Sequence, residues 1–562
     1  MAEAKDAGSG GLQEYGILGV ALGFIGLVVA LWAGLKLAGW VAGVPVEGNP
    51  FDVFVAFVSG QIPMNLLMIV ILVAVVLGFL VVAGVGLWVF YGKRKARKSR
   101  VDYSAMRMSA SKDYKALLHT SAKATSDRLG VNQVGLAIGK TINGGATLYS
   151  GWEDVMIDIW GPRTGKTTSR AVPLVLDAPG AVVATSNKRD LLDVAGPARK
   201  ALVPEGRVWV FDPQGIAQAR QSWYWDPLTF VNNASDAREL AQIFTDAARP
   251  SDGKQDAFFD TEGPQLLVCL IMAATAAGLS IQDVYLWLTN PNDTTPIEIL
   301  RSAGEKILAA ELTEKANAPD KQRGGVYATA KQGLGWLADT NSARWALPGG
   351  GEAFNPDDFA RSRDSIFVLS KEGAGSSAPL TTALTVAITR AAERYAEASG
   401  GRLPVPMVMV LDEAANVVRW RGLPGMYSHY GSRGIVVDTI LQSWAQGAEV
   451  WGKEGIEKLW SSANIKVYGG GDSEVDFLDR LRQTVGKYDQ RTYSSSYSEG
   501  RRTVQNSVRT LDVLDVAELA ALPRGRILVM SSGSKPVLAS PVPYYQGPHA
   551  QLIESVRGSY AW

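Results

Sequence analysis

A glycine-rich turn between an apolar strand and an apolar helix limits the folds open to this chain. Residues 154–160 read DVMIDIW, whose alternation predicts a β-strand, and the turn GPRTGKTT follows at 161–168. Residues 171–176, AVPLVL, favour a short helix. This order suits a phosphate-binding loop, because backbone N–H groups and a helix N-terminus converge on the anion. The full pattern begins with Gly, and here Trp160 stands in that place.

Two long apolar runs precede this turn. The first extends from Gly16 to about Val41 and is interrupted by Lys36, and the second, Leu66 to Tyr91, carries no charge. A bilayer core of roughly 30 Å needs about 20 apolar residues as helix, and both runs reach that length. We therefore expect a membrane domain at 1–92 with transmembrane helices at about 16–41 and 66–91.

The charges beside these runs predict their orientation. GKRKARKSR, residues 92–100, follows the second run directly, whereas the short connection from Pro45 to Pro63 contains Glu47 and Asp52 but no Lys or Arg. Basic residues beside a span favour the cytoplasmic side. We expect a multi-pass protein of the bacterial cytoplasmic (inner) membrane, with both termini and the bulk of the chain in the cytosol.

The body of the chain alternates short apolar runs with helical stretches. Alternation of this kind predicts a doubly wound α/β sheet, and nearly continuous Val, Ile and Met runs are typical of strands covered on both faces. The predicted strands are 154–160, 181–186, 207–213, 364–370, 406–414, 434–443, 464–470 and 525–531.

One long section breaks this alternation. Residues 228–346 are helical in pattern throughout, which predicts an all-α domain inserted into a nucleotide-binding domain made of 93–227 and 347–562. A serine-rich stretch at 491–507 has little to bury and favours an exposed hairpin or a mobile loop.

A second motif completes a site for ATP and Mg²⁺. PMVMVLDEAAN, residues 406–416, is an apolar strand that ends in Asp-Glu. Lys166 is then placed to reach the β- and γ-phosphates, Thr167 and Asp412 to hold Mg²⁺, and Glu413 to act as general base on the attacking water. The predicted phosphate cradle comprises Gly161, Pro162, Arg163, Thr164, Gly165, Lys166, Thr167 and Thr168.

Four further polar residues are candidates for the site, and two of them have a structural alternative. Gln442 ends the strand GIVVDTILQ and is predicted to sense the γ-phosphate or position water, or else to be a hydrogen-bonded amide at a strand end. Arg433 is predicted to act across a subunit boundary as an arginine finger, or else to be a solvated surface residue. Arg163 is a candidate for contacting phosphate or a neighbouring subunit, and Asp190 for steadying the site.

The composition argues against a globally basic surface, a disulfide framework and a zinc site. The 56 Lys and Arg balance 55 Asp and Glu, so any nucleic-acid contact has to be local. The single cysteine, Cys269, rules out an intramolecular disulfide and is expected to be a buried core residue, and three scattered histidines form no zinc-type cluster.

Along nearly its whole length the chain resembles the type IV secretion coupling proteins of the TraG/TraD type, the membrane ATPases of conjugative DNA transfer. The DEAAN and QSWAQ elements, at 412–416 and 442–446, carry this resemblance more specifically than the phosphate cradle does. The other matching features are the two apolar runs, GPRTGKTT, VVATSNKRDLL, VWVFDPQG, YWDPL and SSANIKVYGGGD.

The resemblance implies a RecA-like P-loop ATPase domain that bears the inserted all-α domain. It further implies a homo-hexamer that uses ATP hydrolysis to pump DNA, usually a single strand bound to its relaxase, into a type IV secretion channel. Trp160 departs from the family pattern, where it is expected to tighten the turn or pack against the base. The inserted domain matches only by position and helical character, so substrate choice does not carry over.

Two other functions stay open. A septal-type double-stranded DNA translocase usually carries a winged-helix module after the motor, and here the chain stops about 30 residues after the strand GRILVMS. A receptor that couples protein effectors to secretion, with ATP serving assembly alone, has no need of Glu413 as a base.

Overall fold

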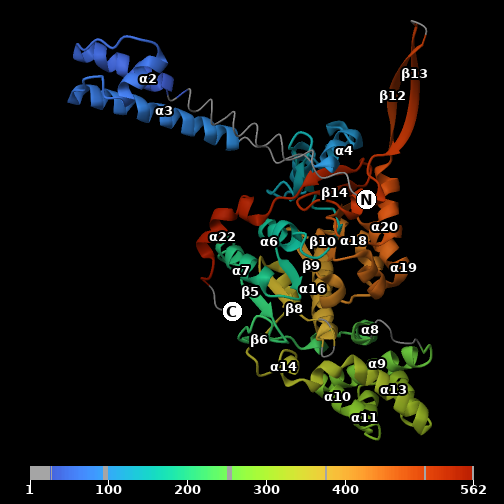
Figure 1. Cartoon of the computed structure of the whole chain (residues 1–562). Coiled ribbons are helices and arrows are strands. Elements are labelled where there is room, and N and C mark those ends of the chain that lie inside the picture. Colours follow the sequence, from blue (N-terminus) through green and yellow to red (C-terminus); the bar gives the residue numbers. More distant parts are fainter. Residues whose placement is uncertain are drawn as a thin grey trace. The chain divides into compact units, whose positions relative to one another are not determined.

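The computed structural model describes residues 26, 28–92, 99–249, 256–371, 373, 376–498 and 501–559. The chain divides into two compact units, Met1–Lys98 and Ser99–Trp562, and Figure 1 shows the helices and strands of each.

The first unit is helical. Residues 28–42 form a helix, α2 spans Pro50–Val58 and α3 spans Leu66–Gly92. The connection that the sequence presents as a loop thus contains α2, which starts because the Asn49 side chain accepts hydrogen bonds from the first backbone N–H groups of the helix. Leu35, Val53 and Leu72 form a small apolar cluster.

The predicted spans are not confirmed by these helices. Residues 16–25 and 27 of the first predicted span lie outside the described residues. Across the part of the chain that the structure describes, no helix combines the length and the hydropathy needed to cross a membrane. Both spans stay predictions.

The second unit is built on an eleven-stranded mixed sheet with the order β2-β1-β15-β14-β11-β3-β10-β9-β4-β8-β5. The strands from β11 to β5 in this order pair in parallel, and the remaining four form an antiparallel edge. The strand bounds are β1 Leu136–Thr141, β2 Thr147–Ser150, β3 Met156–Ile159, β4 Val182–Ser186, β5 Val208–Phe211, β8 Ser365–Leu369, β9 Met407–Asp412, β10 Ile435–Leu441, β11 Ile465–Tyr468, β14 Ile527–Ser531 and β15 Val537–Ser540. All eight predicted strands are present.

Helices cover both faces of this sheet. Alternate residues of β9 belong to different cores, with Val408 and Val410 on one face and Met409 and Leu411 on the other. The helices of this unit outside the inserted region are α4 Arg100–Met108, α5 His119–Arg128, α6 Val172–Asp177, α7 Asp190–Leu202, α15 Pro356–Arg361, α16 Ala378–Ala398, α17 Ala414–Val417, α18 Leu423–Ser432, α19 Trp444–Ser462, α20 Val475–Val485, α21 Val516–Ala520 and α22 Ala550–Val556. Burial on both faces explains the unbroken apolar runs of the parallel strands.

A helical region lies between two very short paired strands, β6 (Trp223–Tyr224) and β7 (Glu352–Ala353). Cys269 is buried in its longest helix, α9, and burial raises the pKa of the thiol to about 12. The helices are α8 Ala234–Ala248, α9 Phe259–Ala277, α10 Ile281–Thr289, α11 Thr295–Ser302, α12 Lys306–Ala316, α13 Asp320–Gly333 and α14 Thr340–Ala343. This run of helices fits the predicted domain bounds 228–346, which stay a prediction.

The serine-rich stretch forms a long antiparallel hairpin of β12 (Lys487–Ser498) and β13 (Arg501–Asp512), with Lys487 paired to Asp512 (Figure 1). Of the two predicted alternatives, the structure therefore shows the hairpin.

Candidate nucleotide site

The phosphate cradle starts where β3 ends between its two parallel neighbours. The backbone N–H of Trp160 donates to the Leu441 carbonyl at 2.9 Å, and that of Gly161 donates to the Gly470 carbonyl at 2.8 Å. These bonds tie the start of the turn to the ends of β10 and β11. The cradle is therefore held at the carboxyl edge of the sheet, where ligands of open α/β sheets bind.

Trp160 is a core residue. Its side chain is buried, and its indole lies so close to Gly469 that a Cβ built there would stand 2.2 Å from the ring. Gly161 approaches Gly471 as closely, because a Cβ on Gly161 would lie 2.5 Å from the Gly471 carbonyl oxygen. This burial favours packing in the turn over contact with a nucleobase.

Hydroxyl groups of the turn donate hydrogen bonds to its own backbone carbonyl groups. Thr164 donates to the Gly161 carbonyl at 2.6 Å and Thr168 donates to the Gly165 carbonyl at 3.0 Å. Gly165 has φ of 102° and Arg163 has φ of 60°, both in the left-handed region that favours glycine. Pro162 and Arg163 are exposed, and Thr167 begins one turn of π-helix that continues into α6.

Five predicted site residues come together at the end of this turn. Lys166 Nζ lies 3.3 Å from Asp412 Oδ1 and forms an ion pair with Glu413. The Thr167 hydroxyl donates to Asp412 Oδ2 at 3.1 Å, and Gln442 Nε2 donates to Glu413 Oε1 at 2.6 Å. One connected network thus joins the glycine-rich turn, the Asp-Glu pair and the end of β10.

Strand register explains this convergence. β10 lies between β3 and β9, with Leu441 paired to Ile159 and Ile440 paired to Asp412. Because all three strands are parallel, their carboxyl ends meet at one edge, and the residues that follow them share that edge.

Glu413 is held in an uncommon backbone conformation. Its φ of 57° and ψ of 39° are left-handed, and its carbonyl accepts the first hydrogen bonds of α17 from Asn416 and Val417. Asn416 Nδ2 also donates to Glu413 Oε2 at 3.4 Å, and Gln446 Nε2 donates to Asn416 Oδ1 at 3.5 Å. Sequence reasoning missed this orienting role of Asn416 and Gln446, although the spacing of Asn416, one helical turn after Glu413, was the available signal.

The site provides oxygen ligands of the kind that Mg²⁺ prefers. Burial raises the pKa of Asp412, and the charge of Lys166 partly offsets that increase. The Thr167 hydroxyl already touches this carboxyl group, so both predicted magnesium ligands lie together. Within the described part of the chain, no cluster of three or more His, Cys, Asp or Glu side chains is arranged to hold a metal ion.

Arg433 lies at the opposite end of β10. It precedes this strand of 7 residues, whereas Gln442 follows it, so about 20 Å of extended chain separates the two. Arg433 pairs with Glu393 at 2.9 Å and Glu397 at 3.1 Å. The structure therefore does not bring Arg433 to the site of its own chain, and its action across a subunit boundary stays a prediction. Asp190 is the exposed first residue of α7.

Comparison with known proteins gives one family match and several solved structures. Residues 406–524 match the family model described as the TraM recognition site of TraD and TraG. The predicted resemblance to type IV coupling proteins is confirmed. No match was found among curated proteins.

Solved coupling-protein structures share the mixed α/β fold. The unbound monoclinic form of the bacterial conjugative coupling protein TrwBdeltaN70 is 17% identical with a TM-score of 0.52, over 72% of this chain and 89% of that chain. Its trigonal form in complex with sulphate is 15% identical with a TM-score of 0.53, over 75% of this chain and 92% of that chain. At this identity the likeness concerns the fold.

Proposed function

We propose that this chain is a membrane-anchored ATPase that recruits conjugative DNA with its bound relaxase and pumps it into a type IV secretion channel. The observation that carries the proposal is the network of Lys166, Thr167, Asp412, Glu413 and Gln442 at the carboxyl edge of the sheet. A cation, a hydroxyl group, a metal-binding carboxyl and a base held by an amide are the parts that phosphoryl transfer from ATP to water requires.

Each of these residues has a distinct task. In the structure Lys166 forms ion pairs with Asp412 and Glu413, and binding of a triphosphate offers it a competing anion. Thr167 and Asp412 would hold Mg²⁺, which neutralises phosphate charge when it is bound. Glu413 accepts a proton from the water that attacks the γ-phosphorus, while the bond from this phosphorus to its bridging oxygen breaks and the electron pair leaves with ADP. Gln442 keeps the Glu413 carboxylate oriented.

Anchoring and assembly complete the proposal. The apolar runs at 16–41 and 66–91 and the basic stretch at 92–100 support a multi-pass anchor in the cytoplasmic membrane with the ATPase in the cytosol. The resemblance to coupling proteins supports a homo-hexamer. The segment 406–524 matches a family described as a recognition site for another protein, which supports docking of a protein partner on this part of the chain.

Variants of the full-length chain, purified in detergent, test the ATPase assignment. We expect Lys166→Ala to lose nucleotide binding, because the phosphates lose their cation. Glu413→Gln should bind ATP and hydrolyse it about 10²–10⁴ times more slowly, which is the usual contribution of a general base. The exposed Glu454→Gln, the same chemical change outside the site, should hydrolyse ATP at the wild-type rate. Equal turnover by Glu413→Gln and Glu454→Gln would contradict the assignment of the base.

The nucleic-acid assignment is tested by the same assay with single-stranded DNA, double-stranded DNA and no DNA. Stimulation by single-stranded DNA supports the conjugative motor. Preference for double-stranded DNA would favour the septal type of translocase, and an ATPase indifferent to both would favour a receptor for protein effectors.

A further inference from the structure

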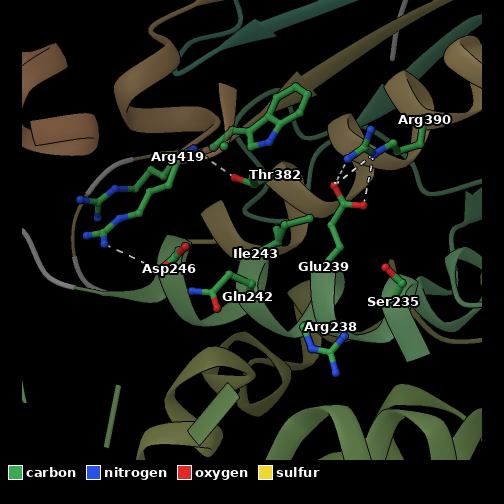
Figure 2. A pocket seen from close by; sticks show the side chains of 12 residues that line it. Ser235, Arg238, Glu239, Gln242, Ile243, Asp246, Thr382, Arg390 and Arg419 are labelled. Carbon is green, nitrogen blue, oxygen red and sulfur yellow. Dashed lines mark hydrogen bonds and ion pairs between the residues drawn. The ribbon is translucent and has the colours of Figure 1, made fainter. Parts of the chain in front are cut away.

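A polar cavity lies outside the nucleotide site. It has a volume of about 460 Å³ and lies between α8, α16 and the segment that follows α17 (Figure 2). Four arginines and two carboxylates line it, and we name it the arginine pocket: Arg238, Arg390, Arg419, Arg421, Glu239 and Asp246.

One of these arginines is neutralised. Arg390 Nη2 donates to Glu239 Oε1 at 2.7 Å, and Nε shares the same carboxylate at 3.1 and 3.2 Å. Its remaining amino group donates to Glu393 at 2.7 Å. Figure 2 shows this fork at one end of the pocket. Arg390 therefore joins α16 to α8 and has little capacity left for a ligand.

Arg419 and Arg421 are paired much more weakly. Arg421 Nη1 lies 3.7 Å from Asp246 Oδ1, and Arg419 Nη2 lies 3.9 Å from Glu449 Oε1. Both separations exceed hydrogen-bond length. Burial lowers the pKa of Arg419, and the positive charge of Arg421 adds to that decrease. The two guanidinium groups are thus neighbours with unused donors, a setting that an anion stabilises.

The backbone that carries these two arginines is fixed. Trp420, between them, is buried, and its carbonyl accepts a hydrogen bond from Trp451 Nε1 at 2.8 Å. The Arg419 backbone N–H donates to the Thr382 hydroxyl at 3.0 Å. One guanidinium donor of Arg419, Nη1, is taken by the Arg249 carbonyl at 3.1 Å, so the unused donors of this side chain are its other ones. A fixed segment loses little conformational freedom when its side chains bind a ligand.

This segment is also joined to the nucleotide site. α17 begins directly after Glu413 and ends at Val417, whose carbonyl accepts a hydrogen bond from Thr381 at 2.6 Å. Arg419 follows two residues later. The arginine pocket therefore lies at the far end of the short helix that Glu413 begins.

We propose that the arginine pocket binds a backbone phosphate of single-stranded nucleic acid, with Arg419 and Arg421 as its anion ligands. Paired guanidinium groups fit a phosphate in a bidentate manner, and arginine contacts with the backbone need no base sequence. Arg421 is exposed, so a strand passing along the surface reaches the pair without entering the core. This inference rests on the proposed function, because it names the residues by which the motor holds its strand.

The test measures binding of a fluorescein-labelled oligothymidylate to the full-length chain at several salt concentrations. In Arg419→Gln/Arg421→Gln we expect affinity to fall about tenfold or more, and the slope of log K against log salt to become shallower by about 0.7, since the loss of one phosphate contact removes about 0.7 for single strands. Arg421→Gln alone should weaken binding less than the double variant does, because Arg419 still contacts the phosphate. This single variant leaves the hydrogen bonds of Arg419 in place if the double variant fails to fold.

The control is Arg394→Gln/Arg557→Gln, which removes the same charge from two exposed positions outside the pocket and should keep the wild-type affinity and slope. Wild-type affinity and slope in Arg421→Gln and in the double variant would overturn the pocket assignment and leave the proposed ATPase standing. Loss of affinity equal to that of the control would overturn it too. A wild-type chain that does not bind the oligothymidylate would overturn both the pocket and the proposed DNA substrate.

Discussion

Two clusters each consist of one cation and two carboxyl groups, and their cations, Lys166 and Arg170, are four residues apart along the chain. The clusters differ in what surrounds them. Lys166 meets Asp412 and Glu413 at the rim of the sheet, where the three side chains are 12%, 2% and 6% exposed. Arg170 meets Asp158 and Asp438 between β3 and β10, where all three are 0% exposed. The carboxyl groups of the first cluster stand at the end of β9 and directly after it, whereas those of the second come from within β3 and β10.

The difference separates a site that can exchange its partner from one that cannot. Lys166 is a flexible ammonium at the rim, so a phosphate can replace its carboxylates. Arg170 is locked, with Nε 2.6 Å from Asp158 and Nη2 2.8 Å from Asp438. Because removal of one member of a buried ion pair leaves an uncompensated charge, we infer that the Arg170 cluster serves stability and the Lys166 cluster serves chemistry.

The largest expected effect comes from making the same change in both clusters. Arg170→Met should lower the free energy of unfolding by about 3–5 kcal/mol, because the buried carboxyl groups of Asp158 and Asp438 lose the cation that they share. Lys166→Met should lower it by less, because this cluster lies at the rim of the sheet and Glu413 keeps its hydrogen bond from Gln442. Urea unfolding followed by circular dichroism measures both. Equal losses would contradict the distinction between the clusters.

Much of the fold and of the nucleotide site was predictable from the sequence, whereas the Arg170 cluster was not. The eight strands and the meeting of Lys166 with Glu413 follow from apolar runs and from the rule that parallel strands end at one edge. Asp158 and Asp438, each inside an apolar strand, were the available signal for the buried cluster. The register of β3 against β10, which places both beside Arg170, is a long-range property that no local pattern contains.

Three strands of the antiparallel edge, β1, β2 and β15, were also missed, for a local reason. β1 and β2 read LAIGKT and TLYS, which are short and contain glycine or few apolar residues. Their stability comes from pairing with β15 and with each other, so tertiary contacts override a weak propensity. The predicted strand 434–443 already placed Arg433 before β10 and Gln442 at its end, and the structure agrees.

A change at Gln442 tests whether the Lys166 cluster serves catalysis. Gln442→Ala removes the amide that holds Glu413, and a hydrogen bond to a charged group is worth about 1.5–3 kcal/mol. We expect ATP turnover to fall roughly 10- to 100-fold, with ATP affinity retained. Steady-state turnover and equilibrium nucleotide binding are the measurements, and Gln446→Ala, which acts on Glu413 through Asn416, should have a smaller effect. Wild-type turnover in Gln442→Ala would leave the amide without a catalytic role.

The pH dependence of stability tests the buried Arg170 cluster. Burial raises the pKa of Asp438 well above its usual 3.8, and the charge of Asp158 adds to the increase. The native state therefore keeps a proton that the unfolded state has lost, so this group's contribution to stability falls as pH rises above about 4 toward the native pKa. Asp438→Asn should remove that fall, measured as unfolding free energy between acid and neutral pH. Parallel pH profiles for variant and wild type would contradict a protonated Asp438.

The smallest expected effect on stability comes from a change at Arg433. This change tests whether Arg433 serves stability, as Arg170 does, or chemistry, as Lys166 does. It is held by Glu393 and Glu397 but is 30% exposed, so releasing it should cost about 1 kcal/mol or less. If it acts in trans, mixing Arg433→Ala subunits with Glu413→Gln subunits should restore part of the ATPase activity that each lacks alone. No recovery at any mixing ratio would assign Arg433 to the fold of its own chain.

The most direct measurement is a structure of the full-length chain bound to Mg²⁺ and a non-hydrolysable ATP analogue. The account predicts Lys166 Nζ within hydrogen-bond distance of the β- and γ-phosphate oxygens, Thr167 and Asp412 beside the metal ion, and Arg170 still paired with Asp158 and Asp438. A nucleotide bound elsewhere, with Lys166 still on Asp412 and Glu413, would contradict it.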